Sequence, residues 1–315
     1  MQIDTPTLDF VGIGAARSGT TWISKCLADH PEVFVPAKKE LHYYNSREHM
    51  ARTPLATYFA DADDEDVYGE YTPRYIINRT ALDHIANAHP DATIIVSLRD
   101  PVERALSQYK QKRYNLEVED IDSFEAALTG PYREDYLTKG LYAYQFSTVF
   151  DIFDRDQIHL VFMKDIKDAP ASVVERLYSS IGVDESFQPP ALKERINESG
   201  PGAGNVLKTD LQSNEVVIRG RTIDTFDRIQ RIGAAAFRKL PAGRAIRPAA
   251  STAFQTVRNK LEASVASVES TDTNRTAGDP TVTDETKRRV YRTYFADEVA
   301  KLETMIDEDL SRWKR

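Results

Sequence analysis

The chain has 315 residues, 41% of them hydrophobic and 29% charged, with a formal net charge of −8 and a pI of about 5.4. This composition is that of a globular protein, and the negative charge excludes nucleic acid as the default partner of the whole chain. The single cysteine, Cys26, excludes an intrachain disulfide and favours a reducing compartment. The sequence begins without the basic and apolar segments of a signal peptide, and no stretch approaches the roughly 18 apolar residues of a membrane span. We therefore expect a cytoplasmic protein.

Short apolar runs alternate with helical patterns along the first 190 or so residues. The runs predict strands at residues 8–13, 33–35, 67–70, 93–98 and 158–163. The segment 93–98 (TIIVSL) is the clearest, because it is β-branched and almost wholly apolar. Helices are predicted at residues 21–28, 78–88, 101–112, 123–128, 141–153 and 171–181, and two more at 283–295 and 297–310. This alternation predicts an α/β fold, a single domain with a central parallel sheet flanked by helices. The order of the strands is left open.

Residues 200–275 differ from the rest of the chain, and we interpret them as a basic, helical insertion. Between Arg219 and Lys260 there are ten Lys or Arg and two Asp, a net charge of +8 that leaves −16 for the remainder. Helical spacing is visible at Phe226, Ile229, Ile232, Ala236 and Phe237. A basic amphipathic helix can lie on an anionic membrane surface, so peripheral membrane contact through 219–260 is one interpretation. A solvated helical insertion is the other.

The loop GAARSGTTW, from Gly14 to Trp22, joins the first predicted strand to the first predicted helix. Its small residues let backbone N–H groups point into a concavity, and the helix N-terminus adds partial positive charge, so the loop is typical of a phosphate-like anion site. Arg17 adds a cation. The nucleotide-triphosphatase loop GxxxxGK[ST] is the nearest alternative, but Thr20 stands at its lysine position, which argues against hydrolysis of ATP or GTP. A turn that merely needs glycine is the other alternative.

RSGTTW resembles the 5′-phosphosulfate loop of sulfotransferases that use PAPS (3′-phosphoadenosine 5′-phosphosulfate). The resemblance implies a P-loop-like phosphosulfate loop whose donor-binding residues are Arg17, Ser18, Gly19, Thr20, Thr21 and Trp22. Trp22 matches the position of an adenine-stacking tryptophan in cytosolic members, although a core aromatic would occupy the same place.

A second segment, IIVSLRDPVERALSQY, resembles the site that binds the 3′-phosphate of the donor in this family. Arg99 ends the predicted strand, and Ser107 follows eight residues later on a helix. A strand end is where ligands gather in open α/β sheets, and a guanidinium can hold a phosphate with two hydrogen bonds. The alternative is a structural ion pair of Arg99 with Asp100 or Glu103.

The segment KKELHYY at residues 38–44 resembles the KE-x-HFF segment of heparan-type and related bacterial sulfotransferases. Its glutamate is the proposed general base there, which implies this role for Glu40. The chemistry agrees, because an acceptor hydroxyl must lose its proton as the sulfuryl group arrives. His42 is the alternative base. Glu40 could also be a solvated surface charge between charged neighbours, without a role in catalysis.

The segment GEYTPRY at residues 69–75 resembles the family's E-x-[ST]-P-x-Y segment. Tyr71 stands where heparan members carry a lysine, which argues against a heparan-like acceptor. Four tyrosines of these two segments offer either an aromatic wall for a sugar ring or half-buried packing: Tyr43, Tyr44, Tyr71 and Tyr75. Similar but weaker matches at residues 140–146, 175–183 and the C-terminus extend the resemblance over most of 8–190 and 275–313.

Together these patterns predict that residues 1–315 form a sulfotransferase domain that moves the sulfuryl group of PAPS to an acceptor hydroxyl. The acceptor would be a small molecule or glycan, with a carbohydrate or glycolipid favoured, and no nucleic acid is expected as partner. Arg17 would stabilise the leaving group and Glu40 would take the proton. No cluster has the spacing of metal ligands, so no metal is expected.

The alternatives are a non-catalytic protein that binds PAP or another polyanion, and a P-loop nucleotide kinase. Arg275 is a weak candidate for a cap over the donor.

Overall fold

The computed structural model describes residues 6–63, 65–115, 121, 123–193, 208–210, 215–218, 221–224 and 282–314. Two units result. The first comprises Met1–Ser199 with Val282–Arg315, and the second comprises Gly200–Thr281.

Five parallel strands form the central sheet of the first unit, as the alternation of strands and helices predicts. They are β1 (Phe10–Gly14), β2 (Val33–Phe34), β3 (Val67–Tyr71), β4 (Thr93–Leu98) and β5 (Ile158–Phe162). The strand order is β2-β3-β1-β4-β5. In the register, Val11 of β1 lies opposite Glu70 on one side and Ile94 on the other. The chain therefore changes direction across the sheet at β1, and such a switch point leaves a crevice at the carboxyl ends of the strands.

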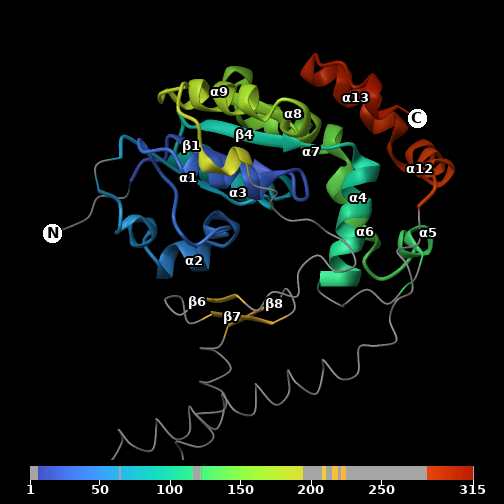
Figure 1. Ribbon diagram of the computed structural model, residues 1–315, viewed down its shortest axis with the longest axis horizontal. Coiled ribbons are helices and arrows are strands. Elements are labelled where there is room, and N and C mark those ends of the chain that lie inside the picture. Colours follow the sequence, from blue (N-terminus) through green and yellow to red (C-terminus); the bar gives the residue numbers. More distant parts are fainter. Residues whose placement is uncertain are drawn as a thin grey trace, which may run out of the picture. The chain divides into compact units, whose positions relative to one another are not determined.

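The sheet is covered on both faces, and a separate hydrophobic cluster fills each side. Phe10 and Ile95 point into the cluster formed with α1 (Thr20–Ala28), α8 (Met163–Asp168) and α9 (Pro170–Ile181). Their neighbours Val11 and Ile94 point into the cluster formed with α3 (Arg79–Ala88), α4 (Pro101–Lys110) and α7 (Tyr142–Ile152). Figure 1 shows α8 and α9 along one face of β4. Burial on both faces explains why the central strands are almost wholly apolar.

The remaining elements of this unit are short, except for α13, which has 11 residues. They are η1 (Tyr43–Asn45), α2 (Arg47–Arg52), η2 (Leu55–Phe59), η3 (Tyr75–Ile77), η4 (Gln111–Asn115), α5 (Phe124–Ala127), α6 (Arg133–Leu137), η5 (Thr138–Gly140), η6 (Arg155–Gln157), η7 (Pro190–Lys193), α12 (Asp284–Val290), η8 (Tyr291–Phe295), α13 (Ala296–Ile306) and η9 (Ser311–Trp313). The sequence did not predict α2, because this helix buries no residue and so carries no apolar periodicity.

Local sequence explains where the main helices begin and end. Asp100 caps α4 by accepting hydrogen bonds from the backbone N–H groups of Val102 (2.8 Å) and Glu103 (3.2 Å), and Pro101 occupies the first helical position. Gly182 ends α9 in the left-handed conformation, with φ of 77°. The cap at Asp100 fixes the start of α4 directly after β4.

The C-terminal segment packs on the first unit although it follows the insertion in sequence. The helix α13 lies beside α7, and the two C-terminal helices, α12 and α13, appear in red in Figure 1. Phe295 is fully buried, and Lys287 of α12 forms an ion pair with Glu103 of α4 at 2.9 Å. Residues 282–314 therefore complete the hydrophobic cluster on the α7 face.

The described parts of the second unit form a three-stranded antiparallel sheet. Its strands are β6 (Lys208–Asp210), β7 (Glu215–Ile218) and β8 (Arg221–Asp224), in the order β6-β7-β8. The helix expected around residues 226–237 and the possible cap at Arg275 lie outside the described residues. Among the residues that the structure covers, no helix has both the length and the apolar character to cross a membrane.

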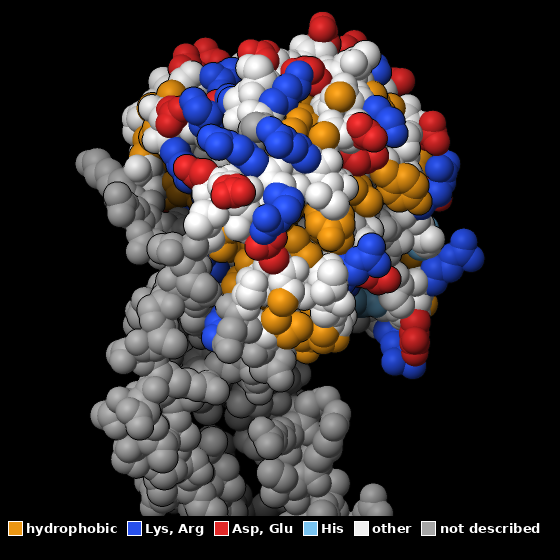
Figure 2. Space-filling model, turned by 90° about the vertical axis from the view of Figure 1, so that its right-hand side faces the viewer, with side chains coloured by type: hydrophobic (Ala, Val, Ile, Leu, Met, Phe, Trp, Pro, Cys, Tyr) orange, Lys and Arg blue, Asp and Glu red, His pale blue; other side chains and the backbone are white. Residues whose placement is uncertain are grey.

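Charges of both signs are mixed on the surface shown in Figure 2, which presents the side that lies on the right in Figure 1. Lys, Arg, Asp and Glu side chains alternate there, with hydrophobic side chains between them. The C-terminal segment also forms ion pairs, such as Lys314 with Glu303 and Arg312 with Asp165. A mixed surface of this kind produces little net field.

Replacing Phe295 by alanine tests the role of the C-terminal segment. Phe295→Ala leaves a cavity in the hydrophobic cluster and is expected to lower the free energy of unfolding by about 3–5 kcal/mol. The same change at its half-buried neighbour, Tyr294→Ala, should cost clearly less. Urea unfolding monitored by circular dichroism measures both. Equal losses for the two variants would contradict the packing described.

Candidate active site

The loop between β1 and α1 has the conformation of an anion-binding turn. Arg17 and Gly19 both adopt the left-handed region, with φ of 73° and 87°. A Cβ atom at Gly19 would lie 2.7 Å from Ile166 Cδ1, so this position requires glycine. The first N–H groups of α1 have no partner within the helix and carry its partial positive charge. Ser18 is fully buried and Thr20 nearly so, which fixes the loop against the body of the unit.

The two segments predicted to bind the donor contact each other. The Arg17 guanidinium donates hydrogen bonds from Nε and Nη2 to Ser107 Oγ, both at 3.1 Å. Arg99 Nη1 donates to the backbone carbonyl oxygen of Arg17 at 3.2 Å. Arg99 also approaches Glu103, but at 4.0 Å this ion pair is at the limit of contact. The adjacency of β1 and β4 brings together residues that are 90 positions apart.

Arg17 lies close to two other arginines, Arg99 and Arg104. Burial, followed by the charges of Arg99 and Arg104, lowers the pKa of Arg17 to about 10, and Glu40 acts in the opposite direction. Arg104 is fully buried and donates through Nη2 to the carbonyl oxygens of Asp135 and Tyr136. Among the described residues, its Nε and Nη1 have no hydrogen-bond partner. Buried cations of like sign are costly unless an anion compensates them, so this group of residues fits a donor that carries phosphate and sulfate groups.

Arg104, which lies five residues after Arg99 in the same segment, is not predicted as a site residue from the sequence. A charged residue on the buried side of α4, between Ala105 and Val102 in the core, was the signal that could have drawn attention to it. Its burial became clear only from the packing of α4 against α6.

Glu40 lies beside the loop, next to two basic side chains. Its backbone is left-handed, with φ of 60°, and its side chain is 37% exposed. Lys39 Nζ contacts Glu40 Oε1 at 3.2 Å and donates to Thr21 Oγ1 at 2.8 Å. His42 Nε2 lies 3.7 Å from Glu40 Oε2. The carboxylate that the sequence singles out is thus linked to the loop through Lys39, a residue to which sequence analysis gave no role.

His42, the alternative base, is close to the same carboxylate. Burial lowers its pKa, the charge of Glu40 opposes this, and Arg74 lowers it further. A neutral imidazole is therefore favoured at neutral pH.

The four tyrosines of residues 43–75 do not form an aromatic wall, and the packing alternative is correct. Tyr43, Tyr44, Tyr71 and Tyr75 are all at most 8% exposed. The Tyr71 ring covers Gly12 so closely that a Cβ there would lie 2.2 Å from it, and its hydroxyl donates to the carbonyl oxygen of Gly14 at 3.1 Å. Tyr71 therefore faces the neighbouring strand, because β3 pairs with β1 along this stretch.

Trp22 packs in the hydrophobic cluster on the α1 face. Trp22 is 7% exposed, and its Nε1–H donates to the carbonyl oxygen of Ala191 at 3.1 Å. This position agrees with a core aromatic. Contact with adenine, through the small exposed part, stays a prediction.

Glu70, at the carboxyl half of β3, is a buried carboxyl group in the same region. It is 1% exposed, and Thr72 Oγ1 donates to its Oε2 at 2.8 Å. Burial raises the pKa of Glu70 to about 7; the hydroxyls of Tyr75 and Thr72 act in the opposite direction, and the charge of Glu40 raises it further. Sequence analysis quoted this residue only as part of the E-x-[ST]-P-x-Y segment.

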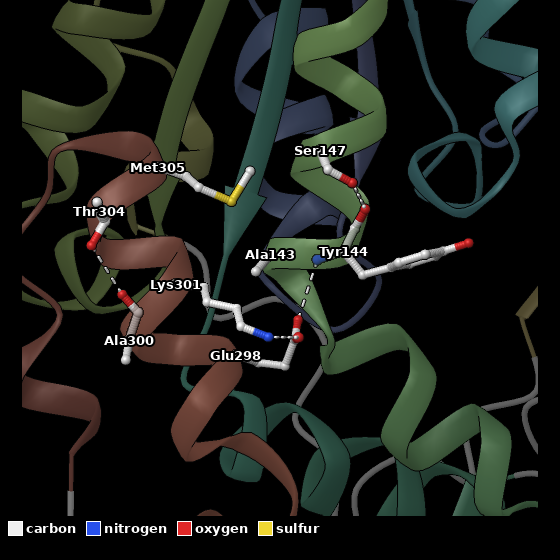
Figure 3. A pocket seen from close by; sticks show the side chains of 8 residues that line it. All are labelled: Ala143, Tyr144, Ser147, Glu298, Ala300, Lys301, Thr304 and Met305. Atoms are coloured by element: carbon white, nitrogen blue, oxygen red, sulfur yellow. Dashed lines mark hydrogen bonds and ion pairs between the residues drawn. The ribbon is translucent and has the colours of Figure 1, made fainter.

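Hollows on the surface of the described residues offer room for a ligand, and two of them differ in character. The first, of about 620 Å³, adjoins the alternative base, His42, and is lined by His42, Asn45, Arg74, Ile77, Asn78, Arg79 and Thr80. The second, of about 660 Å³, is a mainly apolar groove between α7 and α13, where Glu298 points toward α7 and accepts from the backbone N–H of Tyr144 at 3.2 Å (Figure 3). The groove shares no residue with the site around Arg17, Arg99 and Glu40.

Fold and site together define a P-loop-like α/β protein with a cluster of arginines at the carboxyl ends of β1 and β4. Residues 8–198 match the sulfotransferase domain family, and the chain belongs to this family. This confirms the resemblance seen in the sequence.

Three relatives illustrate the similarity. The chain is 36% identical over 104 residues to the membrane-associated sulfotransferase kil1 of Dictyostelium discoideum, which is 32% of this chain and 22% of the relative. It is 28% identical over 179 residues to mouse heparan sulfate glucosamine 3-O-sulfotransferase 3A1, which is 54% of this chain and 44% of the relative. The chain thus spans less than half the length of either. The structure of a sulfotransferase from Alicyclobacillus acidocaldarius covers 98% of this chain and 100% of its own, with a TM-score of 0.62 and 21% identity, and shows the same fold.

The raised pKa of Glu70 predicts a pH dependence of stability. Between pH 4.5 and about 7, the folded protein keeps a proton on Glu70 that the unfolded chain releases, so stability falls as the pH rises through this window. Glu70→Gln stays neutral and should be more stable than the natural protein by roughly 3 kcal/mol at pH 8, with little difference near pH 5.

Chemical unfolding at a series of pH values between 5 and 8 measures this effect. Glu48→Gln, at an exposed carboxylate that pairs with Arg52, is the control and should leave the pH dependence unchanged. If Glu70→Gln had the same pH dependence as the natural protein, Glu70 would not carry the raised pKa.

Proposed function

We propose that this sulfotransferase moves the sulfuryl group of PAPS to a hydroxyl of a carbohydrate or glycolipid acceptor. The contact between Arg17 and Ser107 carries the proposal, because it joins the segment matched to the 5′-phosphosulfate with the segment matched to the 3′-phosphate. Membership of the sulfotransferase family supports it.

The mechanism assigns one task to each part of the site. When bound, PAPS supplies an activated sulfuryl group. Glu40 accepts the proton of the acceptor hydroxyl as the new oxygen–sulfur bond forms. Arg17 and the backbone N–H groups of residues 19–21 stabilise the negative charge on the leaving phosphate oxygen, whose bond to sulfur breaks. Arg99 and Ser107 orient the donor through its 3′-phosphate.

The hollow beside His42 supports a polar acceptor. Asn45 and Asn78 line it and bond to each other, from Asn78 Nδ2 to Asn45 Oδ1 at 3.2 Å, while Arg74 and Arg79 bring positive charge. Amides and guanidinium groups can bond sugar hydroxyls and carboxylate or sulfate groups. The mouse relative is named for heparan sulfate glucosamine, but Tyr71 replaces the lysine of heparan members here, so a different carbohydrate hydroxyl is favoured.

Sulfate transfer from radiolabelled PAPS, measured across pools of glycans and glycolipids with magnesium chelated, tests the proposal. Arg17→Ala should lower kcat about 100-fold or more, because it removes charge that stabilises the leaving oxygen. Arg99→Ala should mainly raise the KM for PAPS. Arg52→Ala, at an exposed ion pair, is the control and should keep full activity.

Other outcomes separate the alternatives. Tight PAP binding without transfer to any pool would identify a non-catalytic binding protein. Phosphoryl transfer from ATP that needs magnesium would identify a nucleotide kinase. Near-normal turnover of Arg17→Ala would contradict the role of the loop.

We also infer that the basic segment 219–260 contacts anionic membrane. Its net charge of +8 supports this, as does similarity to a relative named as membrane-associated. Replacing Arg228, Arg231, Arg238 and Arg244 by glutamine in the full chain should weaken binding to phosphatidylserine vesicles by about 1 kcal/mol per charge. Co-sedimentation measures it, with phosphatidylcholine vesicles as the control. Absence of binding, or equal binding to both kinds of vesicle, would rule the contact out.

A further inference from the structure

We propose that Glu70 is a positioning residue for the general base: through the hydroxyls of Thr72 and Tyr75, it holds the backbone that carries Glu40. This inference rests on the proposed function of Glu40, and it assigns a task to the buried part of the segment GEYTPRY.

The backbone around Glu40 needs to be held. Glu40 and His42 both adopt the left-handed region, with φ of 60° and 54°. Such a conformation is uncommon for residues other than glycine and persists only where the surroundings fix it. The ion pair between Glu40 and Lys39 is more than one-third exposed on the carboxylate side, so it is a weak anchor for the backbone.

Two buried hydroxyls provide the anchor. The backbone N–H of His42 donates to Thr72 Oγ1 at 3.3 Å, and the backbone N–H of Tyr44 donates to Tyr75 Oη at 3.3 Å. Thr72 and Tyr75 are both fully buried. The two bonds attach the stretch from His42 to Tyr44, which is separated from Glu40 only by Leu41, to the segment that leaves β3.

Glu70 sets the direction of these hydroxyls. A hydroxyl has one hydrogen to donate, and Thr72 donates it to Glu70 Oε2 at 2.8 Å, which leaves its lone pairs free to accept from His42. The Tyr75 hydroxyl lies beside the same carboxyl group and lowers its pKa, as a donor to the charged form does. One carboxyl group therefore orients both acceptors of the base loop.

Stability alone does not explain a glutamate at this position. Among the described residues, Glu70 forms no ion pair and its Oε1 has no hydrogen-bond partner, so its burial costs free energy. Its neighbours in the sheet are apolar, with Val11 opposite on β1. A residue that destabilises its own strand and is kept next to the base loop is what a positioning role requires.

Thr72→Val and Thr72→Ser form a matched pair that tests the inference. Valine has the same shape but no hydroxyl, so Thr72→Val should lower kcat about 10- to 100-fold, while the KM for PAPS and the affinity for PAP stay within about twofold. Thr72→Ser keeps the hydroxyl and should restore kcat to within a few-fold. Glu70→Met, which removes the acceptor for the Thr72 hydroxyl, should lower kcat in the same way. Full kcat in Thr72→Val would overturn the inference.

A double-mutant comparison separates positioning from a general structural effect. If Thr72 acts through Glu40, then Glu40→Gln combined with Thr72→Val should lose no more activity than Glu40→Gln alone. Multiplying losses would show that Thr72 acts elsewhere and would contradict the proposal.

Amide hydrogen exchange provides a readout that does not depend on activity. The N–H groups of His42 and Tyr44 should exchange about tenfold faster or more in Thr72→Val and Glu70→Met, with the rest of β3 unchanged. Unchanged exchange would overturn the inference even if no acceptor were found. Absence of sulfate transfer by the natural protein, together with faster exchange in the variants, would instead contradict the proposed function and leave the anchor standing.

Discussion

The hydrogen bonds from the Arg17 guanidinium to Ser107 hold the site together. They are possible only because β1 and β4 are neighbours in the sheet, so that the loop after one strand and the helix after the other begin at the same edge. The cap at Asp100 and the proline at 101 start α4 directly after β4, which brings Ser107 within reach. Arg99 adds a bond to the backbone of Arg17 itself. Any change in the pairing of these strands would separate the two ends of the predicted donor site.

The electrostatics of this edge follow from burial. Burial lowers the pKa of Arg17, Arg99 and Arg104; the charges of Arg99 and Arg104 lower that of Arg17 further, and the charge of Arg99 lowers that of Arg104. A cluster of buried cations is unfavourable by itself. These arginines concentrate positive charge at the edge of the sheet where the proposed anionic donor would bind. The mixed charges on the surface in Figure 2 contrast with this arrangement. The net charge of −8 therefore says little about the ligand, because the local field is opposite in sign to the charge of the whole chain.

The acceptor side is built on backbone conformation and buried hydroxyls. Glu40 contacts the loop through Lys39, which bonds to Thr21, and the backbone is left-handed at both residues that flank Leu41. The segment after β3 supplies the anchors for this turn. Two sequence segments that a family comparison would treat as separate motifs thus form one hydrogen-bonded unit, with Glu70 at its centre.

The sequence by itself determined the elements and the residue types of the site. Its short, mainly apolar runs predicted the five strands described in the first unit, and the signal is clearest for β4, which is buried along almost its whole length. The motifs predicted Arg17, Arg99, Ser107 and Glu40, and the structure brings the first three into direct contact and places Glu40 beside the loop.

Only the tertiary structure decided the strand order, the burial of Arg104 and Glu70, and the direction in which the tyrosines point. These features depend on contacts between residues far apart in the chain. Tyr71 illustrates the reason: as a residue type it suits a ligand wall, but pairing of β3 with β1 turns its ring onto Gly12. Local sequence specifies which side chain is present and which element it belongs to, whereas the neighbour that it meets is set by strand pairing and helix packing.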